Sequence, residues 1–167
     1  YHNLKSKVDL MDLIIVRENT EGFYADRNMY VGNGEFLPEP GIGIAIRKIT
    51  DKGSKRIALR AFEIASNLQK NKSKINLHAI HKANVMKLTD GIFLNACRKV
   101  AKSFPEINYS EMIIDAAAAH LVRNPSQFDV LLTTNMFGDI LSDLAAELSG
   151  SLGLAGSINV GDGIPMA

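Results

Sequence analysis

The clearest pattern in the chain runs from Asn135 to Gly150, where apolar residues recur at steps of three and four positions. This spacing places them on one face of an amphipathic helix. Asn135 is suited to cap the helix N-terminus, and Gly150 stands where the helix is expected to end. The apolar run from Asp129 to Thr134 leads directly into this helix and predicts a strand. The apolar helix positions are Met136, Ile140, Leu141, Leu144, Ala145 and Leu148.

Similar patterns predict the elements that come before. Residues 8–16 end in an almost unbroken apolar run, which is typical of a strand covered on both faces. Ile42, Ile44 and Ile46 alternate with smaller or polar neighbours and predict a half-buried strand in antiparallel pairing. Asp51 or Ser54 is expected to cap the next helix. Further strands are expected at 75–80 and 110–114, and further helices at 85–104 and 115–122.

Strands therefore alternate with helices along the whole chain. This order predicts an α/β fold with a mixed sheet flanked by helices. Residues 25–41 contain three glycines and two prolines and are expected to form a loop. We expect residues 1–167 to form one domain, with the segment from about 25 to 50 as an excursion from the main sheet.

Composition narrows the class of protein. With 46% hydrophobic and 22% charged residues, the chain is typical of a globular protein. Its net charge of +1 predicts neither nucleic-acid nor membrane partners, and no apolar run approaches the length of a membrane span. The single cysteine, Cys97, excludes an internal disulfide framework and favours a reducing compartment, so we expect a cytoplasmic protein, or one of the mitochondrial matrix if the source is eukaryotic. Because the first residue is Tyr1 and the chain stops at Ala167 after a glycine-rich tract, we expect it to be a piece of a larger protein.

Candidate chemistry follows the predicted strands. Polar residues cluster at 17–24, at 81–84, at Asp115 and at 135–143, each at or near a predicted strand end. In open α/β sheets, the carboxyl ends of the strands carry the groups that bind ligands. The coincidence of four such clusters indicates a functional site more strongly than any one of them does.

Asp139 and Asp143 lie four residues apart in the predicted helix. Their side chains then share one helix face, where like charges destabilise a helix by a few tenths of a kcal/mol. A divalent cation such as Mg²⁺ or Mn²⁺, which prefers carboxylate oxygens, would offset that cost. The alternative is a solvated helix face, because acidic residues are common there and the helix dipole favours them in the first turn. Taken alone, the pair fits the solvated face better.

Lys82 and Tyr24 have comparable alternatives. A lysine after a strand is usually solvated, and a tyrosine in a loop is usually a packed aromatic. Near a metal ion and buried carboxylates, however, the pKa of a lysine can be tuned so that it acts as an acid or base. A tyrosine next to a metal ion or an ammonium group can donate a proton. Zinc is not expected, because the histidines show no spacing typical of zinc ligands. They are His2, His78, His81 and His120.

Three stretches together resemble the isocitrate and isopropylmalate dehydrogenases, which are metal-dependent β-decarboxylating dehydrogenases. They are Arg17-Glu-Asn-Thr-Glu-Gly-Phe-Tyr24, His81-Lys-Ala-Asn-Val-Met-Lys-Leu-Thr-Asp-Gly91 and Asn135-Met-Phe-Gly-Asp-Ile-Leu-Ser-Asp143. The resemblance covers residues 9–166 and implies the smaller, dimerisation domain of that fold, with the excursion as its clasp-like part. Family segments of the larger domain, including two further substrate arginines and the cofactor loop, are absent from the sequence.

The resemblance implies a shared metal site. Asp115, Asp139 and Asp143 would hold Mg²⁺ or Mn²⁺, which chelates the hydroxyl and the adjacent carboxylate of the substrate. In this family Asp115 and Lys82 reach the site from the other subunit, so the expected partner is a second copy of the chain in a homodimer.

The resemblance also implies roles in substrate binding and catalysis. Arg17 would bind a substrate carboxylate. Asn84 would lie near the substrate and the nicotinamide end of NAD or NADP. Lys82 would assist removal of the hydroxyl proton, and Tyr24 would protonate the enol that remains after CO₂ leaves.

The implied substrate is isocitrate, converted to 2-oxoglutarate and CO₂. Isopropylmalate enzymes typically have Leu-Thr-Gly-Gly after the Arg-Glu pair and an aspartate at the position of His81. This chain has Asn19-Thr20-Glu21-Gly22 and His81 instead. Homoisocitrate, isopropylmalate, tartrate and malate remain alternative substrates, and a dimerisation module without chemistry is the alternative function. We expect the chain alone to keep the metal ligands but to lack turnover.

Overall fold

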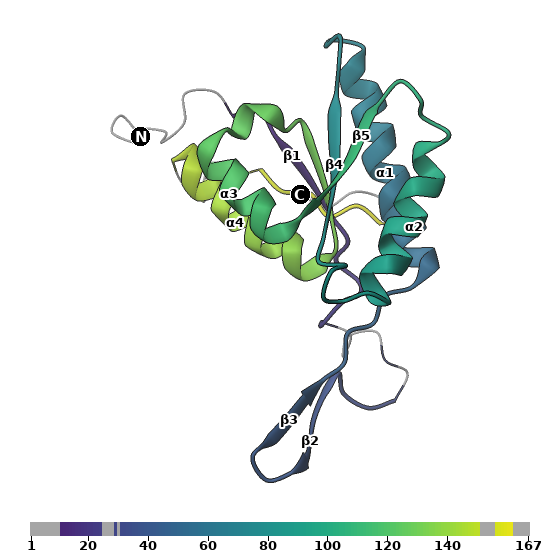
Figure 1. Ribbon diagram of the computed structural model, residues 1–167, viewed down its shortest axis with the longest axis vertical. Helices are drawn as coiled ribbons and strands as arrows, with labels where there is room; N and C mark the ends of the chain where they lie inside the picture. The colour runs from purple at the N-terminus through teal and green to yellow at the C-terminus, as the bar shows by residue number, and fades with distance from the viewer. Residues whose placement is uncertain (1–10, 25–28, 30, 151–155, 162–167) are drawn as a thin grey trace.

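The computed structural model describes residues 11–24, 29, 31–150 and 156–161. Over these residues, a four-stranded sheet has the order β1-β6-β4-β5, and all neighbouring strands are parallel. Helices α1 and α2 cover one face of this sheet, and α3 and α4 cover the other (Figure 1). The strands are β1 (Ile14–Arg17), β4 (Asn76–His81), β5 (Asn108–Ile113) and β6 (Val130–Thr133), and the helices are α1 (Asp51–Gln69), α2 (Thr89–Ala101), α3 (Ile114–Arg123) and α4 (Asn135–Ser149).

Side chains of the inner strands alternate between two apolar layers. Leu77 and Ala79 of β4 lie in the cluster with α1 and α2, and Ile80 lies in the cluster with α3 and α4. All four residues of β6 are buried, as in a strand covered on both faces, and its first three are apolar. The strand β6 is the last of the described strands in sequence, yet it lies between β1 and β4.

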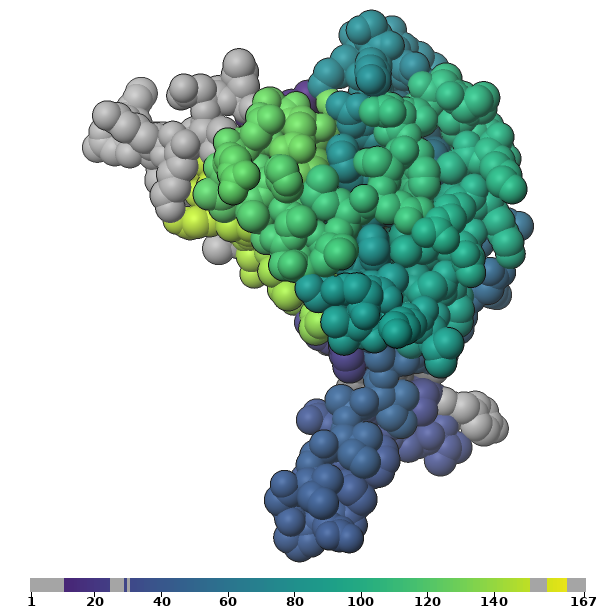
Figure 2. Space-filling model, viewed as in Figure 1, coloured from purple at the N-terminus to yellow at the C-terminus, as the bar shows by residue number. Residues whose placement is uncertain are grey.

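A separate hairpin projects from this body (Figures 1 and 2). Its strands are β2 (Glu35–Glu39) and β3 (Ile42–Ala45), paired antiparallel, and every residue in them is exposed. Gly41 lies in the turn with φ +84°, a conformation that glycine adopts without strain. The prediction of a half-buried strand at 42–46 is therefore wrong for residues 42–45, because no layer of the described chain packs against the hairpin.

The α/β class with helices flanking a sheet is confirmed. The antiparallel pairing expected from the alternating isoleucines occurs in the hairpin, whereas the central sheet is parallel because helical crossovers join its strands. The single-domain assignment of residues 1–167 stays a prediction. Among the described residues, no helix is both long enough and apolar enough to span a membrane.

Helix ends agree with the predictions only in part. Gly150 ends α4 with φ +111°, as expected. The N-cap of α4 is Thr134, not Asn135, because the Asn135 side chain is engaged in tertiary hydrogen bonds. The N-cap of α1 is Thr50, whose side chain accepts from the Gly53 N–H, rather than Asp51 or Ser54.

Candidate functional site

Arg17 links the ends of two neighbouring strands. It is the last residue of β1, and its Nε and Nη2 donate to Oδ1 of Asn135 at 3.0 and 2.7 Å. Its Nη1 donates to Oδ1 of Asp139 at 2.7 Å. Asn135 in turn donates through Nδ2 to the Glu21 carbonyl at 3.0 Å. The guanidinium is thereby fixed over the first turn of α4.

Gly138 makes this approach of Arg17 to the helix possible. A Cβ at this position would lie 2.5 Å from Cγ of Arg17 and 2.4 Å from Oγ1 of Thr133. Contacts that short do not occur in folded proteins, so a side chain at this position would displace Arg17 or Thr133. The glycine in the Asn-Met-Phe-Gly-Asp motif therefore has a packing role in the site.

An open pocket of about 340 Å³ lies over these residues, lined by Arg17, Asn19, Tyr24, Asn135 and Asp139. The Tyr24 hydroxyl donates to Oδ2 of Asp139 at 3.0 Å. Both oxygens of the Asp139 carboxylate therefore accept hydrogen bonds, one from a cation and one from a phenol. The structure brings together three predicted site residues from distant parts of the sequence, namely Arg17, Tyr24 and Asp139.

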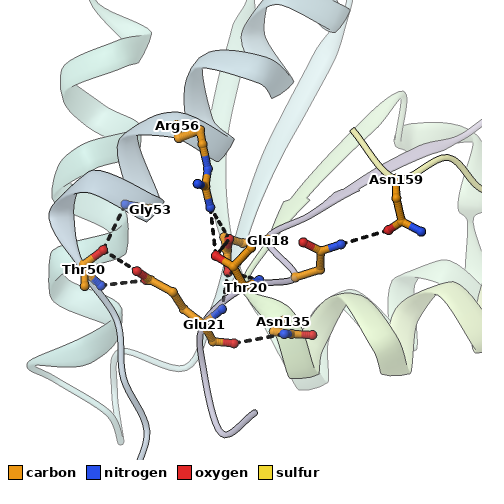
Figure 3. Close-up of polar contacts among 9 residues, drawn as sticks. Glu18, Thr20, Glu21, Thr50, Gly53, Arg56, Asn135 and Asn159 are labelled. Carbon is orange, nitrogen blue, oxygen red and sulfur yellow. Dashed lines mark hydrogen bonds and ion pairs between the residues drawn. The ribbon is translucent and has the colours of Figure 1, made fainter. Parts of the chain in front are cut away.

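The acidic residues of the loop after β1 bind to residues at the start of α1 (Figure 3). The buried Glu18 carboxylate accepts from the backbone N–H groups of Thr20 and Glu21 at 2.9 and 2.8 Å, and from Arg56 at 2.8 Å. The buried Glu21 carboxylate accepts from the N–H of Thr50 at 2.8 Å and from its hydroxyl. Both glutamates hold the loop to the start of α1, and neither lines the pocket.

Lys82 and Asp115 form a second group of predicted site residues. They follow β4 and β5, and their side chains form an ion pair in which Asp115 is exposed. The hydrogen bond from Lys82 lowers the pKa of the Asp115 carboxyl. In the described part of the chain, no hydrogen bond or ion pair connects this pair with Arg17 or Asp139, and the neighbouring Asn84 is exposed.

The acidic residues of α4 fit a hard divalent cation. Asp143 is exposed one turn after Asp139, and Mg²⁺ is usually bound by one or two carboxylates together with water and substrate oxygens. Asp115 lies in the other group, and the described residues contain no cluster of three possible metal ligands. Within the described part of one chain, the three predicted ligands are therefore not brought together.

One buried ion pair was not predicted from the sequence. Arg47 donates to the Asp90 carboxylate, and their side chains are only 7% and 0% exposed. The other oxygen of Asp90 accepts the backbone N–H of Lys82 at 2.5 Å. Sequence patterns contain no local signal for this contact, because its members lie 43 residues apart.

Comparison with known proteins identifies the family. A family model described as isocitrate/isopropylmalate dehydrogenase matches residues 1–167. The chain is 50% identical to 3-isopropylmalate dehydrogenase of Archaeoglobus fulgidus over 152 residues, which are 91% of this chain and 43% of that protein. It is 47% identical to isocitrate/homoisocitrate dehydrogenase of Thermus thermophilus over 152 residues, which are 91% of this chain and 42% of that protein.

A solved structure agrees with these relatives. The crystal structure of isocitrate dehydrogenase from Methylococcus capsulatus matches 97% of this chain and 46% of its own, with a TM-score of 0.85 and 39% identity. The chain thus spans less than half the length of the proteins that it matches. From the match to the family model, the sequence identities and the shared fold, the chain belongs to the isocitrate/isopropylmalate dehydrogenase family of oxidoreductases.

Proposed function

We propose that this chain is the substrate- and metal-binding part of a decarboxylating dehydrogenase that converts isocitrate to 2-oxoglutarate and CO₂ and reduces NAD or NADP. The observation that carries the proposal is the pocket in which Arg17 and Tyr24 converge on Asp139. Relatives named as isocitrate dehydrogenases support the choice of substrate, among them the NAD catalytic subunit 5 of Arabidopsis thaliana, 44% identical over 98% of this chain and 41% of that protein.

The residues of the pocket have complementary tasks in this reaction. The planar guanidinium of Arg17 suits bidentate binding of a substrate carboxylate. Asp139 and Asp143 would hold the metal, and Tyr24 would donate its proton to the enol carbon. A bound Mg²⁺ or Mn²⁺ supplies a Lewis acid that lowers the pKa of the substrate hydroxyl.

Lys82 and Asp115 complete the site from a second subunit in this proposal. Lys82 would assist removal of the hydroxyl proton, Asp115 would contribute the third carboxylate, and Asn84 would lie at the nicotinamide end of the cofactor. The separation of the Lys82–Asp115 pair from the Arg17–Asp139 pair within one chain supports this arrangement. The active site then exists only in the dimer.

A second candidate substrate is 3-isopropylmalate. The three relatives at 50%, 46% and 44% identity from Archaeoglobus fulgidus, Saccharolobus solfataricus and Sulfurisphaera tokodaii are all named 3-isopropylmalate dehydrogenases. Two sequence features that favour isocitrate have structural tasks here. Glu21 bonds Thr50, and Nδ1 of His81 accepts the Ala83 N–H at 3.0 Å. Of the features used to choose isocitrate, Asn19 is the one that lines the pocket.

Calorimetric titration with Mn²⁺ tests the metal-binding part of the proposal. We expect saturable binding to a dimer of the 167-residue chain, with dimerisation checked by light scattering. Asp143→Asn should abolish binding because it removes one carboxylate ligand. Asp51→Asn, which changes an exposed acidic residue in the first turn of α1, is the matched control and should bind normally. Failure of the folded dimer to bind Mn²⁺ would contradict a metal site on these residues.

Turnover is tested in a chimera in which this chain replaces the matching segment of the Thermus thermophilus isocitrate/homoisocitrate dehydrogenase. A second chimera uses the Archaeoglobus fulgidus 3-isopropylmalate dehydrogenase as host. We expect the ratio of kcat/KM for isocitrate to that for 3-isopropylmalate to rise in the second chimera relative to its host. A fall of that ratio in the first chimera would favour 3-isopropylmalate. Folded, dimeric chimeras without turnover would support the dimerisation module.

A further inference from the structure

We infer that Asp90 and Arg47 form a positioning pair that sets the place of Lys82; the inference rests on the proposed catalytic role of Lys82. Asp90 is fully buried in the first turn of α2. One carboxylate oxygen accepts the backbone N–H of Lys82 at 2.5 Å, and the other accepts from Nη1 of Arg47. A shift of this carboxylate therefore moves the main chain that carries the Lys82 ammonium group.

Arg47 connects this carboxylate with the other segments of the site. Its Nη1 also donates to Oγ1 of Thr89 at 2.6 Å, and its Nη2 donates to Oγ1 of Thr134 at 3.2 Å. Thr134 immediately precedes Asn135, which holds Arg17. The Lys82 segment and the start of α4 are thus held by one guanidinium.

Aromatic rings enclose the same guanidinium. Its Cζ lies 5.8 Å from the ring centre of Phe23 and 5.7 Å from that of Phe137. Phe23 is the neighbour of Tyr24, and Phe137 lies on α4 two residues before Asp139. Cation–π contacts of this kind are strongest where water is excluded, and the Arg47 side chain is only 7% exposed. Of the four polar clusters predicted from the sequence, Arg47 therefore contacts residues in or beside those at 17–24 and 135–143, and it reaches the cluster at 81–84 through Asp90.

Hydrophobic residues would stabilise a buried site at least as well as an ion pair does, because burying two charges has a large desolvation cost. What hydrophobic residues cannot supply is an acceptor for the Lys82 N–H and donors for Asp90 and Thr134 in fixed directions. Because a shift of about 1 Å at a reacting group can lower a rate about 100-fold, fixed directions matter most for a group that transfers a proton. The contacts of Arg47 and Asp90 are therefore suited to positioning Lys82.

The chain offers a matched control at the opposite end of β4. The buried carboxylate of Asp129 accepts the backbone N–H of Asn76 at 2.8 Å and a hydrogen bond from Lys72. Like Asp90, Asp129 is a buried carboxylate that accepts one backbone N–H and one bond from a cationic side chain. Asp129, however, lies at the amino end of β4, away from the pocket. Asp90→Asn and Asp129→Asn therefore make the same change near the site and far from it.

The first experiment measures amide hydrogen exchange in the 167-residue chain by NMR. Asparagine offers one acceptor oxygen where Asp90 offers two. Because its NH2 group is repelled by the Arg47 guanidinium, its oxygen faces Arg47, and the Lys82 N–H loses its acceptor. We expect Asp90→Asn to accelerate exchange of the Lys82 amide at least tenfold and Asp129→Asn to leave it unchanged. Unchanged Lys82 exchange in Asp90→Asn would overturn the inference without touching the proposed function.

The second experiment measures steady-state kinetics in the Thermus thermophilus chimera. We expect Asp90→Asn and Arg47→Met to lower kcat about 10- to 100-fold while KM changes less than about threefold. Arg47→Lys should restore part of kcat because it keeps the charge. Asp129→Asn should lower stability but not kcat per folded molecule. Equal loss of kcat in the Asp129 and Asp90 variants would show a purely structural role. If the parent chimera lacks turnover, the proposed function fails. The positioning role is then decided by the hydrogen exchange of the Lys82 amide alone.

Discussion

The two ends of β4 use the same chemistry in different surroundings. At the amino end, the carboxylate of Asp129 takes one hydrogen bond from the backbone and one from Lys72, whose side chain is 53% exposed. At the carboxyl end, Asp90 takes one from the backbone and one from Arg47, whose side chain is 7% exposed. A solvated cation is sufficient to hold a strand end. A buried arginine, with several donors in fixed directions, can hold several segments at once.

The largest difference between the two ends should appear when each cation is removed. Arg47→Met leaves Asp90 buried without its charged partner, and removal of one member of a buried pair costs about 3–5 kcal/mol. Lys72→Met should cost about 1 kcal/mol or less, because Lys72 is largely in water. Urea denaturation monitored by circular dichroism measures both values.

A double variant checks the cause of this difference. Arg47→Met combined with Asp90→Leu removes both buried charges, so it should be more stable than Arg47→Met alone. Equal destabilisation by Arg47→Met and Lys72→Met would mean that burial of the cation does not distinguish the two ends.

The second prediction concerns the packing of Gly138 against Arg17 and Thr133, at the carboxyl ends of β1 and β6. Gly138→Ala places a methyl group 2.4 Å from Oγ1 of Thr133 and 2.5 Å from Cγ of Arg17, and we expect a loss of about 1–3 kcal/mol. Gly91→Ala in α2 is the control, because no atom lies within 4 Å of the added Cβ. There the higher helix propensity of alanine should stabilise the chain by about 0.5–1 kcal/mol. Thermal denaturation of both variants measures the difference, and stabilisation by Gly138→Ala would contradict the packing role.

Protonation of His78, near the amino end of β4, should change the free energy of unfolding less than any of the substitutions above. Burial lowers its pKa, and the nearby His120 lowers it further, although Asp129 opposes the shift. The folded state therefore binds the proton only below the pH at which the unfolded state does, near 6.5. The free energy of unfolding should decrease as the pH falls through this window.

Denaturation at several pH values between 5 and 7 measures this contribution. We expect His78→Phe to reduce the pH dependence, because phenylalanine binds no proton. It keeps the edge contact with the Phe128 ring, whose centre lies 4.9 Å away, so packing is preserved. His120→Gln should retain most of the slope. An unchanged slope in His78→Phe would mean that other groups cause it.

Sequence patterns predicted those parts of the molecule that depend on local spacing. The helix α4 and its end at Gly150 follow from apolar periodicity and from the conformational freedom of glycine. Residues 35–39 form strand β2, where the sequence predicts a loop, because Pro38 and two preceding glycines are typical of loops. The sequence pattern predicts a helix from about residue 85, but α2 begins at Thr89. Residues 83–88 form turns and a bend, and apolar periodicity does not distinguish these from the first turn of a helix.

The candidate site shows the same limit. The motifs predicted Arg17, Tyr24 and Asp139, and the structure brings these residues together. The contacts of Arg47 and Asp90 join residues that are distant in sequence, so no window of the chain reveals them. The roles predicted for Lys82, Asn84, Asp115 and Asp143 involve a metal, a cofactor or a second subunit, and they stay predictions.

The strand order has a consequence for folding. Among the strands of the described four-stranded sheet, β6 follows the other three in the sequence, and it pairs with β1 across more than 110 residues, as in the pair Ile14 and Val130. Contacts so distant in sequence slow folding because the loop must close before they form. Until β6 inserts, β1 and β4 present unpaired edges that can associate with other chains. The strand order of this sheet thus leaves the chain vulnerable to aggregation in the interval before β6 takes its place between β1 and β4.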